Sequence, residues 1–71
     1  MKESRYELII FWDASDQIFV VDVPELPGCM AHGRTKKEAI AQAEAAIDLW
    51  IETAKKDGIP LPEPRGRLMF A

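Results

Sequence analysis

The chain has 71 residues, 48% of them hydrophobic, and its nine Lys and Arg against twelve Asp and Glu give a net charge of −3. This length predicts one domain, residues 1–71, with a marginal core, and the acidic balance disfavours direct binding to a nucleic-acid backbone. Because the chain holds one cysteine and one histidine, neither a disulfide framework nor a structural zinc site can reinforce that core, which leaves self-association.

Three strands are predicted in the first half of the chain. Residues 6–12 and 18–23 are dense in β-branched and aromatic side chains, as strands are. Residues 13–17 between them are short and polar, which indicates a hairpin loop. Pro24, Pro27 and Gly28 then interrupt regular pairing and predict a shaped loop. Residues 29–33 have room for a short third strand.

One long amphipathic helix is predicted next. Thr35 and Glu38 form a capping box, in which the threonine hydroxyl accepts from the Glu38 amide and the glutamate reaches back to the Thr35 amide, so the helix begins near Lys36. Gly58 is the expected C-cap. Apolar residues recur at intervals of three and four and predict the face that packs on the sheet: Ile40, Ala43, Ile47, Trp50, Ile51 and Ala54.

The remaining residues are predicted to return to the sheet. Prolines at positions 60, 62 and 64 favour an extended segment that crosses back, and residues 65–70 read as a last short strand. The fold class is therefore α+β: a three-stranded antiparallel sheet, one long helix and a final short strand, in the order β-β-β-α-β.

Both faces of the predicted sheet carry large apolar side chains. Because side chains alternate along a strand, Leu8 and Ile10 point to one face while Ile9 and Phe11 point to the other. One helix covers one face, so two phenylalanines and several aliphatic residues would stay in water, at about 1.5 to 3 kcal/mol each. Twist and the proline-rich segment would hide part of this surface. The alternative is that the uncovered face is a protein interface. Its partner would be either further copies of the chain, as a dimer or tetramer, or a different protein.

The residues able to carry chemistry do not assemble into a catalytic set. Cys29 and His32 are three positions apart, so in an extended segment they point to opposite faces; we expect a buried cysteine and a surface or interface histidine. Asp13 and Asp16 are typical turn formers rather than ligands of a two-metal site. We therefore expect no enzyme, no cofactor and no metal site, and keep a residual metal-dependent nuclease, which would use Asp13 and Asp22, as the weaker alternative.

No stretch approaches the roughly 20 apolar residues of a membrane span, and the amino terminus lacks the apolar run of a signal peptide. We expect a cytoplasmic protein with no membrane partner. The lone thiol fits a reducing compartment.

The segment Val23-Pro24-Glu25-Leu26-Pro27-Gly28-Cys29, followed by Gly33, Thr35, Glu38-Ala39 and residues 43–47, resembles the HicB antitoxin family. The resemblance continues through residues 59–62 and so covers nearly the whole chain. It implies a sheet similar to a reduced ribonuclease H fold without its catalytic residues. It also implies a partner, HicA, a small basic mRNA-cleaving toxin whose active site the domain masks. An acidic inhibitor suits a basic nuclease, because complementary charge speeds their encounter.

Two features depart from the family pattern. Many members continue into a DNA-binding segment whereas this chain stops at Ala71, so we expect no direct DNA binding. Arg34 stands where an acidic residue is common. A solitary oligomeric scaffold without a toxin is kept as an alternative function. Our candidates for partner contacts are Phe11, Trp12, Phe19, Asp22, Glu25 and His32.

Overall fold

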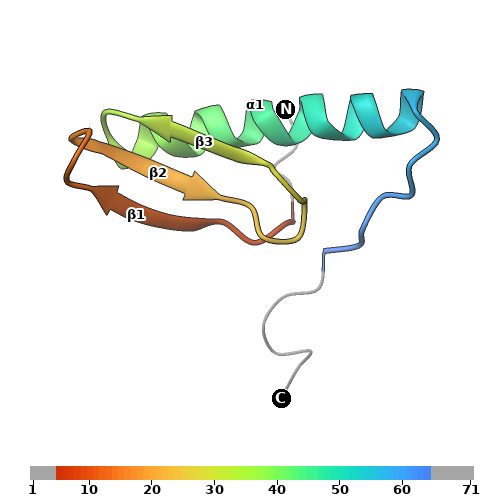
Figure 1. The fold of residues 1–71 in the computed structure, drawn as a ribbon, viewed down its shortest axis with the longest axis horizontal. Coiled ribbons are helices and arrows are strands. Elements are labelled where there is room, and N and C mark those ends of the chain that lie inside the picture. The colour runs from red at the N-terminus through yellow and green to blue at the C-terminus, as the bar shows by residue number, and fades with distance from the viewer. Residues whose placement is uncertain (1–4, 65–71) are drawn as a thin grey trace, which may run out of the picture.

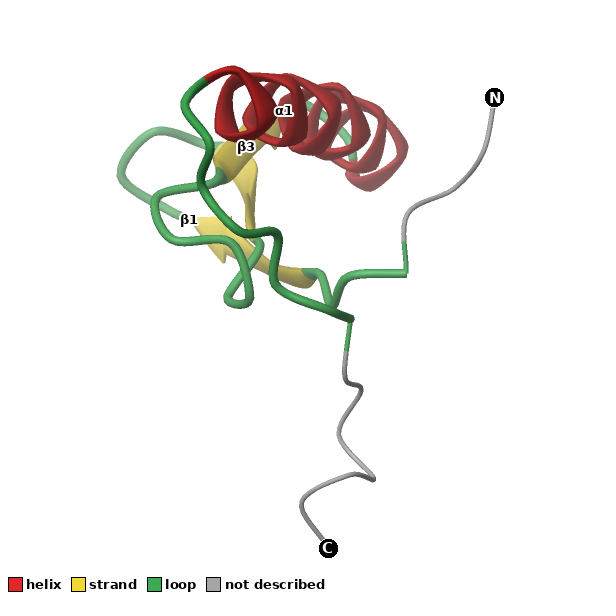
Figure 2. Ribbon diagram, turned by 90° about the vertical axis from the view of Figure 1, so that its right-hand side faces the viewer, coloured by secondary structure: helices red, strands yellow, loops and turns green. Residues whose placement is uncertain are grey.

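The computed structural model describes residues 5–64, so the predicted final strand, residues 65–70, lies outside the described part. The described elements are β1 (Ile9–Asp13), β2 (Ile18–Asp22), β3 (Met30–Gly33) and α1 (Lys36–Lys56), shown in Figure 1. The strands form an antiparallel sheet in the order β1-β2-β3, and α1 lies across one face of it (Figure 2). The predicted α+β class, with a three-stranded antiparallel sheet and one helix, is confirmed.

The β1–β2 hairpin closes through the predicted turn chemistry. The Asp13 carboxylate accepts hydrogen bonds from the backbone amides of Ser15 and Asp16, at 3.0 and 3.2 Å. Gln17 completes the turn with a φ of 57°. The first strand is shorter than predicted, because regular pairing begins at Ile9 rather than at residue 6.

The loop between β2 and β3 is built from two consecutive turns. The Leu26 amide donates to the Val23 carbonyl at 3.1 Å and the Cys29 amide donates to the Leu26 carbonyl at 3.0 Å. The second turn has Pro27 and then Gly28 at its centre, and Gly28 has a φ of +78°, the combination that a type II turn requires. The Trp50 indole donates to the Pro27 carbonyl at 2.9 Å, so the loop is fastened to α1.

Both ends of α1 are capped. The Thr35 hydroxyl accepts from the Glu38 amide at 3.0 Å, as predicted, but the Glu38 carboxylate accepts from the amide of Arg34, at 2.8 Å, rather than from that of Thr35. At the other end Asp57 is the C-cap and Gly58 follows it, with a φ of +69°. The predicted C-cap is therefore displaced by one residue. The amide of Ile59 donates to the Ala54 carbonyl at 2.8 Å, which makes the end a Schellman motif.

The core lies between α1 and the sheet and consists of two clusters. One joins Val23, Leu26, Cys29 and Ile47; the other joins Val21, Ala39 and Ala43. The predicted helix face is correct except at Ile40, which is exposed, while Ala39 is buried in its place. Beyond α1 the chain crosses back toward the start of the sheet (Figure 1), where the Tyr6 hydroxyl donates to the Pro62 carbonyl.

Candidate protein-binding surface

Alternation along the strands gives the sheet one covered face and one uncovered face. Leu8, Ile10, Phe19 and Ala31 pack against the cluster that α1 forms with Val21. The intervening residues point away from α1. We call this uncovered side the open face, and its residues are Ile9, Phe11, Asp13, Ile18, Val20, Asp22, Met30 and His32.

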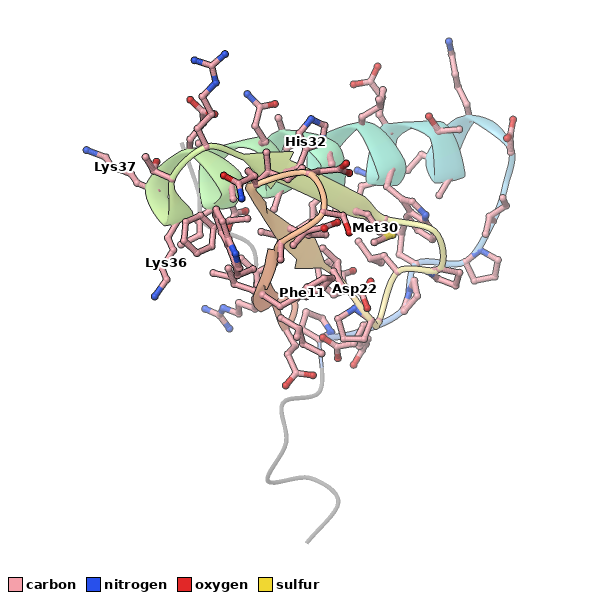
Figure 3. The ribbon with its side chains drawn as sticks, turned by 60° about the vertical axis from the view of Figure 1, so that its left-hand side comes forward. Phe11, Asp22, Met30, His32, Lys36 and Lys37 are labelled. Atoms are coloured by element: carbon pink, nitrogen blue, oxygen red, sulfur yellow. The ribbon has the colours of Figure 1, made fainter. Side chains whose placement is uncertain are left out.

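The strand register arranges the open face in rows across the sheet. Ile9 pairs with Asp22, which pairs with Met30; in the next row Phe11 pairs with Val20, which pairs with His32. Figure 3 shows Phe11, Asp22, Met30 and His32 together on this side. The exposed fractions are 37% for Ile9, 46% for Phe11 and 55% for Met30. The proline-rich residues 59–64 thus leave these side chains accessible.

The open face carries two carboxylates and no lysine or arginine. Its acidic residues are Asp13 and Asp22. Asp22 is half-buried between the side chains of Ile9 and Met30 on the neighbouring strands. The surface is therefore apolar with an embedded carboxylate.

The six predicted contact residues divide between three places. Phe11, Asp22 and His32 lie on the open face. Trp12 and Phe19 lie on the side of α1, where their rings form an edge-to-face pair with centroids 5.0 Å apart. The expectation that both phenylalanines lie uncovered is therefore wrong for Phe19, which packs on the helix side and has the Lys36 ammonium 5.8 Å from its ring centre.

Glu25 has a structural contact in this fold. It lies in the loop after β2, and its carboxylate accepts from the Glu7 amide at 2.8 Å, so it fastens the segment that precedes β1. Met30 and Ile9, by contrast, were missing from the predicted set although they are exposed on the open face. Strand alternation, combined with the register of β3 against β2, is the signal that would have identified Met30 as a residue of the open face.

Cys29 and His32 lie apart, as their spacing predicts. Cys29 is buried in the core, where burial and then the nearby Asp22 carboxylate raise the pKa of its thiol, whereas His32 is exposed on the open face. Within residues 5–64 no three His, Cys, Asp or Glu side chains gather as metal ligands would. The helix of the described part is too polar to cross a membrane.

Comparison with known proteins gives relatives over most of the chain. The family model described as "HicB_like antitoxin of bacterial toxin-antitoxin system" matches residues 6–67. A UPF0150 protein of Thermoplasma acidophilum is 45% identical over 58 residues, which cover 82% of this chain and 83% of the relative. A UPF0150 protein of Synechocystis is 35% identical over 76% of this chain and 74% of its own length.

A third relative is much longer than this chain. It is an uncharacterized 14.9 kDa protein from the rep-hol intergenic region of Haemophilus phage HP1, which is 42% identical over 63% of this chain but only 34% of its own length. No solved structure matches the chain.

Proposed function

The chain belongs to the HicB-like antitoxin family, and from this premise we propose that it binds a small basic HicA-type toxin and inhibits its cleavage of mRNA. The observation that carries the proposal is the family match over residues 6–67. The open face supports it, since it is an accessible, apolar surface of the kind that marks protein interfaces.

The charges of the open face favour a basic partner. When a partner covers Ile9, Phe11 and Met30, it also removes Asp22 from water. A buried carboxylate that finds no donor or cation costs several kcal/mol, so an apolar or acidic partner is disfavoured. A lysine or arginine of the partner would instead form a charge-assisted hydrogen bond with Asp22. The same negative charge would speed the encounter with a positively charged toxin.

The test is co-expression of the chain with the small basic protein encoded beside its gene. We expect the two proteins to co-purify, and we expect the purified complex to cleave mRNA more slowly than the toxin alone. Removing one partner of a buried charged pair costs about 2 to 5 kcal/mol. Asp22→Lys should therefore weaken the complex by at least about 30-fold.

Asp48→Lys is the matched control. It makes the same change in charge at an exposed position of α1 and should leave binding within about twofold, as is typical of surface changes away from a contact. If the two variants inhibit the toxin equally well, the open face is not the toxin-binding surface. If no small basic reading frame adjoins the gene and none co-purifies from the native host, the antitoxin function itself is wrong.

A further inference from the structure

A carboxylate and two aromatic rings are neighbours at the centre of the open face. Phe11, Val20 and His32 form one row across the three strands, so the two rings flank Val20. Asp22 lies two residues beyond Val20 on β2, which makes both rings its diagonal neighbours, at about 7 to 8 Å between Cα atoms. Figure 3 shows Phe11, Asp22 and His32 on the same side of the sheet. We call these four residues the Asp22 patch.

The Asp22 carboxylate is half-buried but has no hydrogen-bond donor within the described chain. It lies between the apolar residues Ile9 and Met30, which pair with it across the sheet. No side chain or amide of residues 5–64 donates a hydrogen bond to it. The other carboxylate of the open face, that of Asp13, already accepts from two amides of the hairpin turn. Asp22 is therefore the open-face carboxylate that is available to a ligand.

The Phe11 ring is exposed and also lacks a partner. The ring contacts of the described part lie on the covered side of the sheet, where Trp12 packs edge to face on Phe19 and the Lys36 ammonium lies 5.8 Å from the Phe19 ring centre. Neither a ring nor a cation of the described residues contacts Phe11. The face of an aromatic ring attracts a cation within about 6 Å of its centre, and arginine is the more frequent partner. The ring beside Asp22 therefore offers a second contact to a cation that binds the carboxylate.

We propose that the Asp22 patch binds one arginine side chain of the protein partner and selects it over lysine; this inference rests on the proposed function, which supplies the partner. A guanidinium group is planar, so its edge can donate two hydrogen bonds to a carboxylate while its face stacks on an aromatic ring. It makes both contacts at once, with its edge toward Asp22 and its face on Phe11. An ammonium group is a strongly hydrated point charge, and the apolar neighbours of Asp22 cannot replace the water that it would lose.

The first test uses the free chain and a small probe, so it needs no toxin. N-acetyl-arginine methylamide is titrated into the isotope-labelled full chain and followed by NMR, in parallel with the lysine analogue. The arginine probe should shift the amide signals of the Asp22 patch, with a dissociation constant on the order of millimolar, and the lysine probe should bind at least about fivefold more weakly. Asp22→Asn keeps the shape of the side chain and should abolish this difference. Asp48→Asn, at an exposed position of α1, is the matched control and should retain it.

The role of the ring is tested by the ratio of the two dissociation constants. Phe11→Leu keeps an apolar side chain without a ring and should reduce the preference for arginine to within about twofold, whereas Phe11→Tyr keeps the ring and should retain the preference. Because Phe11 is exposed, both variants should fold, and urea unfolding checks this. Equal binding of the two probes by the wild type, or a preference that survives in Asp22→Asn or Phe11→Leu, overturns the proposal. So does a probe affinity that falls as the chain is concentrated, because an arginine of a second copy would then occupy the site.

The second test uses the basic protein that co-purifies with the chain. Each arginine of that protein is changed to lysine in turn, and one of these changes should weaken the complex by about tenfold. The effect of that change should nearly vanish when the chain carries Asp22→Asn or Phe11→Leu, because directly contacting residues are coupled in a double-mutant cycle. A complex that tolerates every arginine-to-lysine change overturns the arginine site and leaves the antitoxin function standing. If no basic protein co-purifies, the antitoxin function fails, and the probe titration alone decides whether the Asp22 patch selects arginine.

Discussion

Gly33 allows α1 to approach β3 more closely than any other residue at that position would. A Cβ added there would lie 2.5 Å from the backbone nitrogen of Ala39 and 2.9 Å from its Cα. Non-bonded heavy atoms of this kind need about 3.5 Å, so in Gly33→Ala the first turn of α1 must move by about 1 Å. That movement would loosen the packing of Ala39 and Ala43 on Val21, which are all fully buried.

The expected magnitude combines two opposing effects. Overpacking of this kind costs about 1 to 3 kcal/mol. Replacing a glycine stabilises by about 0.4 to 1 kcal/mol through the unfolded chain when the backbone angles suit alanine, and Gly33, unlike Gly28 and Gly58, does not have a positive φ. The free energy of unfolding of Gly33→Ala should therefore fall by about 1 to 2 kcal/mol, which is a large share of the total stability of so small a domain.

Urea unfolding followed by tryptophan fluorescence measures this change. The denaturation midpoint should fall, and the melting temperature should drop by about 4 to 8 °C for each kcal/mol. Because the obstructing atoms belong to the backbone, adding Ala39→Gly should not restore stability. A Gly33→Ala chain as stable as the wild type, or one rescued by Ala39→Gly, would refute the reasoning.

Three further predictions concern the cap, the loop and the buried thiol. Thr35→Ala removes the acceptor of the Glu38 amide and should lower the free energy of unfolding by about 1 kcal/mol. Thr35→Ser keeps a hydroxyl and should retain most of the wild-type stability, so equal losses in the two variants would contradict the capping role. Trp50→Phe leaves the Pro27 carbonyl without its donor and should cost about 1 kcal/mol or more, measured by urea unfolding against Trp12→Phe. The pKa of the Cys29 thiol is raised in the folded state. The contribution of this thiol to the free energy of unfolding is therefore intact at neutral pH and is lost as pH rises through the folded pKa. Wild-type stability should therefore fall more steeply than that of Cys29→Ala at alkaline pH, and parallel curves would contradict this.

Local signals in the sequence predicted the elements well. Both helix ends were located to within a residue, because Thr35 and Gly58 act through hydrogen bonds and backbone angles that involve only a few neighbours. The turn at Asp13 and the loop at Pro27 and Gly28 were predictable for the same reason. The extent of β1 was not predictable. Residues 6–8 have strand-forming side chains but pair with no strand in the described part, because strand pairing is decided by tertiary packing rather than by propensity.

The open face was predictable in outline but not residue by residue. Alternation showed that both faces of the sheet are apolar, yet it could not say which face of the second strand joins which face of the first. The register supplies that link: Phe11 pairs with Val20, so Phe19 belongs with Trp12 on the covered side. A shift of one residue in the register of the hairpin would have placed Phe19 on the same face as Phe11. The length of the loop after Asp13 sets this register.

The exposed surface between β3 and α1 depends on strand order, which no single segment encodes. Leu49 lies outside the apolar stripe of α1, and an isolated exposed leucine is ordinary on a protein surface. It gains significance because the strand beside it, β3, is an edge of the sheet within residues 5–64. The loop from Pro24 to Gly28 returns β3 to pair with β2 rather than with β1, and this choice leaves β3, not the hairpin, beside Leu49. The surface around Leu49 therefore arises from two segments, residues 30–33 and the middle of α1, which become one surface only after the chain has folded.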